Sequence, residues 1–189
     1  MALKILRCVR GADAVGAWQL YLLGDSARRD GDVVLSTRLA AQMFTRQADG
    51  TLAQRWLLRD RIAPDEAGAW FSRKLSEFDG LDADGRAAPL LVLRFVAWKD
   101  EDATRGVDEG DDAGRLKIVL PGGEPPATVM AVTGTLDDER HTTANDTYFT
   151  LPEPTRRHVE RLLRAWNRDQ VFLSADNGGT FVPRRQKRH

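Results

Sequence analysis

The chain has 189 residues, of which 42% are hydrophobic and 30% charged, and its 28 basic and 28 acidic residues give a formal net charge of zero. This length suffices for one domain with a sizeable core, and the composition excludes an intrinsically disordered protein. No apolar run is long enough to span a bilayer, and Lys4, Arg7 and Arg10 interrupt the apolar stretch that a secretory signal needs. The single cysteine, Cys8, excludes an internal disulfide, so we expect a cytoplasmic protein without a membrane partner.

The first third of the chain predicts strands with one helix between them. The strands are expected over residues 3–9, 17–23 and 52–62. Cys8 lies in the middle of the first apolar run, where we expect a buried and inert side chain. Residues 36–47 are expected to form a helix, because Ser36 or Thr37 can cap it and apolar residues fall on one face.

A second helix is predicted over residues 64–79. Pro64 in the first turn, the acids Asp65 and Glu66 beside it and Gly80 after the last turn are typical helix boundaries. Four large apolar side chains follow a 3.6-residue period and are expected to face the core: Trp70, Phe71, Leu75 and Phe78.

The second half of the chain predicts more strands and a long helix. The strands are expected over residues 88–98, 115–121 and 127–136, with the first of them central in its sheet. Asn177 and Gly178 tolerate a positive φ, so residues 171–183 predict a hairpin. We expect an α+β fold: a largely antiparallel sheet or open barrel, two main helices at about 64–79 and 153–168, and this C-terminal hairpin. One domain over residues 1–182 and a basic tail over 183–189 complete the expected organisation.

Residues 156–169, RRHVERLLRAWNRD, hold five arginines in fourteen residues. Helical spacing places Val159, Leu162, Leu163 and Trp166 on one apolar face. It places Arg157, Arg161, Arg164 and Arg168 on a second face, called the arginine stripe below. From residue 155 onward, nine basic residues and three acids give a net charge of +6, which the rest of the chain cancels.

Such an asymmetry is typical of a surface that binds a polyanion, and the planar arginine fork matches the oxygens of a phosphate. We therefore predict contacts with the phosphates of DNA or RNA from nine basic residues: Arg156, Arg157, Arg161, Arg164, Arg168, Arg184, Arg185, Lys187 and Arg188. Two simpler interpretations remain open. The arginines can form a solvated face and tail, or they can pair with the chain's own acids.

Two acidic segments offer weaker candidates for a metal. Residues 100–112 hold seven acids and one arginine and predict a surface loop, since Gly106 is one position late for an EF-hand. Residues 137–146 place His141 close in sequence to four acids, a set that can hold a metal or form a general-base pair but also describes an ordinary polar turn.

Sequence motifs for catalysis are missing from the chain. It has no Gly-rich phosphate loop, no Cys/His zinc spacing and no nucleophile elbow, so we expect no cofactor, no metal and a role other than catalysis. The leading hypothesis is a nucleic-acid-binding domain or a small subunit of a nucleoprotein assembly. The alternatives are a protein-interaction module for an acidic partner and a metal-dependent hydrolase that uses residues 137–146. The sequence shows no exposed aromatic series, which argues against a platform for stacking single-stranded bases.

Overall fold

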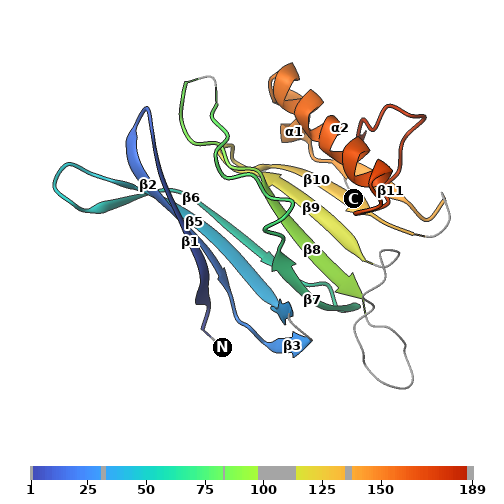
Figure 1. Ribbon diagram of the computed structural model, residues 1–189, viewed down its shortest axis with the longest axis horizontal. Coiled ribbons are helices and arrows are strands. Elements are labelled where there is room, and N and C mark those ends of the chain that lie inside the picture. The colour runs from blue at the N-terminus through green and yellow to red at the C-terminus, as the bar shows by residue number, and fades with distance from the viewer. Residues whose placement is uncertain (1, 31–32, 83, 98–113, 135–137, 187–189) are drawn as a thin grey trace.

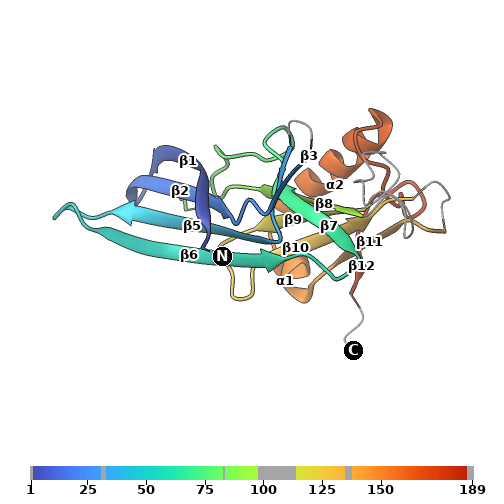
Figure 2. The ribbon, with the colours of Figure 1, turned by 90° about the horizontal axis from the view of Figure 1, so that it is seen from below.

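The computed structural model describes residues 2–30, 33–82, 84–97, 114–134 and 138–186. Its layers are a four-stranded sheet, a six-stranded sheet and a helical layer, seen side by side in Figures 1 and 2. The fold is mostly β, with 48% strand and 13% helix, so the expected α+β class is wrong. The sheets are largely antiparallel, as expected, but they do not close into a barrel. In the described part of the chain, neither helix is long and apolar enough to cross a membrane.

The four-stranded sheet has the strand order β1-β2-β5-β6. Its strands are β1 (Lys4–Asp13), β2 (Gly16–Gly24), β5 (Arg38–Arg46) and β6 (Leu52–Arg61). Alternate residues of β2 and β5, such as Leu20, Leu22 and Met43, pack against the six-stranded sheet. The opposite face of this sheet is called the outer face below. A short hairpin of β3 (Arg28–Asp30) and β4 (Val33–Leu35) follows β2.

The six-stranded sheet lies in the middle of the molecule and has the order β12-β11-β10-β9-β8-β7. Its strands are β7 (Glu66–Phe71), β8 (Leu91–Ala97), β9 (Arg115–Leu120), β10 (Ala127–Val132), β11 (His141–Ala144) and β12 (Arg184–Arg185). β12 pairs with β11 in parallel, and the other neighbours are antiparallel. Strand β8 is buried on both faces, because Leu91 and Leu93 pack toward the four-stranded sheet and Val92 toward the helices.

The helical layer consists of α1 (Asp146–Thr150) and α2 (Glu153–Arg168), so the helix predicted over 153–168 is confirmed. Asn145 caps α1 by accepting a hydrogen bond from the backbone N–H of Tyr148. The apolar face of α2 packs on the six-stranded sheet through Val159, Leu163 and Trp166, which are buried as the spacing predicted.

The helix predicted over residues 64–79 does not form, and strand β7 takes its place. The backbone of Ala69 pairs with Ser36 on one side, and β7 pairs with β8 on the other. A side chain on Gly68 would collide with Leu35, which shows how closely β4 approaches this strand. Of the four large apolar residues expected to face the core, Phe71 and Leu75 are buried and Trp70 and Phe78 are partly buried, but tertiary pairing overrides the helical pattern around them.

Two further expectations about secondary structure are wrong. Residues 38–46 form β5 instead of a helix, because Leu39, Ala41 and Met43 all reach the core at a spacing of two. Residues 171–183 contain no hairpin: Asn177 and Gly178 do have positive φ, but Phe172 and Phe181 are buried beneath α2 instead of lying on paired strands.

Six strands lie where the sequence predicted them, whereas β3, β4, β11 and β12 were not predicted. β1, β2, β6, β8, β9 and β10 fall within or beside the expected ranges. Cys8 is an exception to the expected burial, since its side chain is exposed on β1, an edge strand of the four-stranded sheet. The acidic segment 100–112 lies outside the described residues.

Candidate nucleic-acid interface

The arginine stripe of α2 is exposed, but two of its members are paired with neighbouring acids. The Arg157 guanidinium pairs with Glu153, one turn earlier. Nε of Arg168 lies 2.8 Å from a carboxylate oxygen of Asp169, and this pairing lowers the pKa of Asp169 and raises that of Arg168. Half of the stripe is thus partly neutralised within the molecule.

The other two members of the stripe also have contacts. Arg164 donates to the carbonyl oxygens of Gly179 and Thr180 at 3.4 and 3.3 Å and lies over the ring of Phe181. Arg161 lies 3.3 Å from Nδ1 of His158, whose Nε2 is 2.6 Å from Glu77. Arg164 thus ties α2 to residues 179–181, whereas Arg161 contacts a residue of α2 itself.

The remaining predicted residues do not share the exposed face of α2. Arg156 is half-buried, and its Nε has no hydrogen-bond partner in the structure. Arg184 and Arg185 lie on β12 at the edge of the six-stranded sheet, where Arg185 pairs with Asp146 at 2.6 Å and covers Phe149. Lys187 and Arg188 lie outside the described residues.

A different basic surface lies on the outer face of the four-stranded sheet. Residues alternate across a strand, and strand pairing places the residues that alternate with the core on this face. Its arginines come from three strands: Arg10 on β1, Arg38 and Arg46 on β5, and Arg59 and Arg61 on β6. No aspartate or glutamate occupies an outward position on the four strands.

Four of these arginines have no partner among the described residues. Arg38 contacts Asp25 at 3.5 Å, but the side chains of Arg10, Arg46, Arg59 and Arg61 make no ion pair or hydrogen bond with any described residue. The acids of the same sheet are engaged elsewhere. On the core-facing side, Asp60 pairs with Lys117 of β9 at 2.7 Å, and Asp13 pairs with Arg55. The outer face therefore carries positive charge that the described part of the molecule leaves unneutralised.

An aromatic pair occupies the middle of the outer face. Tyr21 on β2 and Phe44 on β5 have ring centroids 5.9 Å apart, with ring planes at 73°. Both are half-buried, and neither belongs to a hydrophobic cluster of the interior. The Tyr21 hydroxyl donates to the side-chain oxygen of Gln19. Figures 1 and 2 show both helices at the opposite, six-stranded side of the molecule.

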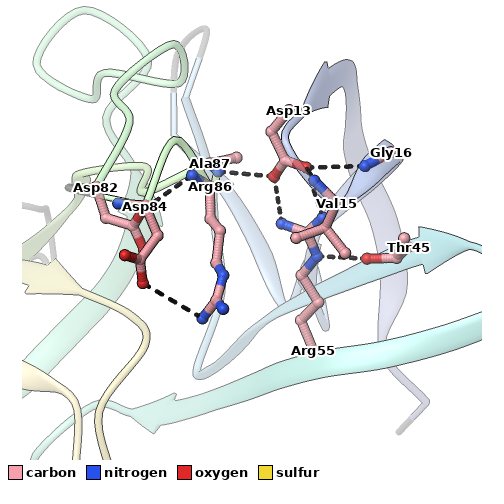
Figure 3. A network of polar contacts seen from close by, with 9 residues as sticks. All are labelled: Asp13, Val15, Gly16, Thr45, Arg55, Asp82, Asp84, Arg86 and Ala87. Carbon is pink, nitrogen blue, oxygen red and sulfur yellow. Dashed lines mark hydrogen bonds and ion pairs between the residues drawn. The ribbon is translucent and has the colours of Figure 1, made fainter.

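A polar network on the core-facing side holds this sheet in shape (Figure 3). Arg55 of β6 reaches the Asp13 carboxylate at the end of β1 and also donates to Thr45 of β5. Asp13 further accepts from the backbone N–H of Ala87 at 2.7 Å. These bonds, led by the one from Arg55, hold the pKa of Asp13 well below its usual range. The two edge strands of the sheet are thus fixed relative to each other.

Residues 137–146, which were predicted as a loop with a metal or general-base site, contain a strand and the start of a helix. His141 begins β11 and Asp146 begins α1, whereas Asp137 lies outside the described residues. Asp138 and His141 line a cavity of about 640 Å³ together with Arg140 and Arg184. Within the described residues, no three histidine, cysteine, aspartate or glutamate side chains are grouped so that they could hold a metal ion.

No protein-family model, curated protein sequence or solved structure matches this chain. The function must therefore be argued from the geometry of its surfaces.

The outer face escaped the sequence-based prediction because its arginines are far apart in the chain. The signal was nevertheless present in β5: Arg38, Gln42, Phe44 and Arg46 fall on alternate positions of RLAAQMFTR. In the predicted helix over residues 36–47, these side chains would point in different directions. Only in a strand do they share one face. The expectation of a basic face without an exposed aromatic series concerned residues 153–188, so the half-buried Tyr21–Phe44 pair on another surface does not test it.

Proposed function

We propose that the protein binds nucleic acid on the outer face of its four-stranded sheet, with Arg10, Arg46, Arg59 and Arg61 contacting phosphates. The observation that carries the proposal is the absence of a partner for these four side chains among the described residues, on a face without acids. Arginine pairs with phosphate through two parallel hydrogen bonds, and such contacts give affinity without reading sequence. The role is that of a binding domain or of a subunit in a nucleoprotein assembly.

The arginine stripe of α2 is a weaker candidate for the same role. A phosphate that binds Arg157 or Arg168 competes with Glu153 or Asp169. The competing pairs are exposed, so water and salt screen them and each costs little to break. A phosphate on the outer face breaks no such pair at Arg10, Arg46, Arg59 or Arg61. The stripe remains a second predicted contact surface, on the other side of the molecule.

Two variants with matched charge separate these surfaces. One carries Arg10→Gln, Arg46→Gln, Arg59→Gln and Arg61→Gln, and the other carries Arg157→Gln, Arg161→Gln, Arg164→Gln and Arg168→Gln. Each removes four positive charges, so a loss of non-specific attraction affects both equally. We expect the outer-face variant to lose most of its affinity for oligonucleotides and the α2 variant to keep most of it.

The measurement is a fluorescence-anisotropy titration of a labelled oligonucleotide at several salt concentrations. For a single strand, the slope of log affinity against log salt should become shallower by roughly 3 in the outer-face variant, since each phosphate contact contributes about 0.7. Equal losses in both variants, or a larger loss in the α2 variant, would contradict the assignment of the face. No binding by the unmodified protein at low salt would refute the function and favour an acidic protein as the partner.

A further inference from the structure

The centre of the outer face differs in chemistry from its margins. The residues at the centre are aromatic or carry amides: Tyr21 and Gln19 on β2, and Phe44 and Gln42 on β5. The arginines surround them, with Arg10 on the edge strand β1, Arg59 and Arg61 on the edge strand β6, and Arg46 at the end of β5.

We infer that the ligand of this face is a single-stranded nucleic acid, whose bases contact the Tyr21–Phe44 pair while its phosphates reach the marginal arginines. This inference rests on the proposed function and adds the class of nucleic acid. Bases of a single strand are free to stack on aromatic rings, and the stacking does not depend on base identity. The two rings meet edge to face, with their planes at 73°, and both are partly exposed on this side of the sheet.

Strand register places Tyr21 and Phe44 in rows that also contain glutamine amides and an arginine. One row across the sheet runs Cys8, Tyr21, Gln42 and Leu57, and the next runs Arg10, Gln19, Phe44 and Gln54. Strands in a sheet are about 4.8 Å apart, so each row extends about 14 Å between its outer strands. Glutamine amides in these rows can donate to and accept from base edges, which adds hydrogen bonds without adding charge.

A duplex would contact only part of this surface. Its phosphates lie on the outside and its bases are stacked within, so only the arginines would gain contacts while Tyr21 and Phe44 lost water. A second copy of the chain is also disfavoured, because an interface between two outer faces would bring arginines together without acids to pair with them. An acidic protein would pair with the arginines, but it offers no regular series of planar groups between its charges, as the bases of a single strand do.

The test replaces the rings while keeping apolar cover on the sheet, with Tyr21→Leu and Phe44→Leu. The matched controls, Tyr21→Phe and Phe44→Tyr, retain an aromatic ring at each position. The probes are an oligothymidylate and an oligouridylate of roughly 12 nucleotides, within the range of site sizes for single-strand binders, and a DNA duplex with the same number of phosphates. Each leucine variant should bind both single strands about tenfold more weakly, and each control should bind them like the unmodified protein.

The duplex measurement separates this inference from the proposed function. Duplex affinity reports the arginines, so it should stay within about twofold in the leucine variants and confirm that their surface is intact. If the leucine variants bind single strands as well as the controls do, or if the unmodified protein prefers the duplex, the inference is wrong while the proposed function stands. If the unmodified protein binds none of the probes, both are refuted.

Discussion

At the scale of single residues, the Asp13 carboxylate joins the two edge strands of the sheet that carries the candidate face. Its side chain has no solvent exposure, and the side chain of its partner Arg55 is only 16% exposed. Backbone N–H groups of Val15 and Ala87 also donate to it. A buried carboxylate is stable only when its lone pairs are filled in this way. Arg10, Arg46, Arg59 and Arg61 of the outer face have no comparable support among the described residues, which leaves them available to a ligand.

The substitution Asp13→Asn should lower the free energy of unfolding by about 2–3 kcal/mol at neutral pH, because it leaves Arg55 without its charged partner. Urea denaturation followed by circular dichroism measures the loss. The control is Asp49→Asn at the exposed tip between β5 and β6, where Asp49 bonds only within its own turn. Equal stability of the Asp13 variant and this control would show that the network does not brace the sheet.

The stabilities of the unmodified protein and of Asp13→Asn should also depend differently on pH. The pKa of Asp13 is below its ordinary value of 3.8 in the folded state, so the carboxylate stabilises the fold at pH values above about 4. This stabilisation is lost as the pH falls below that value toward the folded pKa. The difference in stability between the unmodified protein and Asp13→Asn should therefore shrink in acid, and a constant difference would contradict the shift.

At the scale of elements, β7 shows why local pattern and tertiary structure disagree. Residues 64–79 carry helix boundaries and a helical apolar period, yet residues 66–71 pair with β8. The helical period was informative about burial, since Phe71 and Leu75 are in the interior, but not about backbone conformation. By contrast α2 was predictable, because its period, its length and its proline at the first turn agree and no strand competes for it.

Gly68→Ala tests whether residues 66–71 form a strand, because the substitution should change stability in opposite directions for a helix and for a strand. In an exposed helix, alanine in place of glycine raises stability by about 0.5–1 kcal/mol. In β7, the added Cβ would lie 2.7 Å from the Cβ of Leu35, so the backbone of β4 or β7 must shift and stability should fall by more than 1 kcal/mol. Thermal unfolding of the variant distinguishes the two signs, and a raised melting temperature would favour a helix.

At the scale of the whole molecule, the zero net charge hides two separate basic surfaces. The sequence revealed the one on α2, because its arginines are close together in the chain. It did not reveal the other, since Arg10, Arg46 and Arg59 are brought together only by the order β1-β2-β5-β6. The positions of six of the twelve described strands could be predicted from apolar runs, but neither their pairing nor the three layers could, as these depend on contacts between distant residues.

Cys8 allows the central claim to be tested without changing the protein. It is the only cysteine of the chain, its side chain is exposed, and it lies directly opposite Tyr21 on the outer face. The rate of its alkylation by iodoacetamide, followed by intact mass, should fall severalfold when a single-stranded oligonucleotide saturates the protein. Free glutathione in the same mixture controls for effects on the reagent. Unchanged alkylation of Cys8 at saturating oligonucleotide would contradict binding on this face.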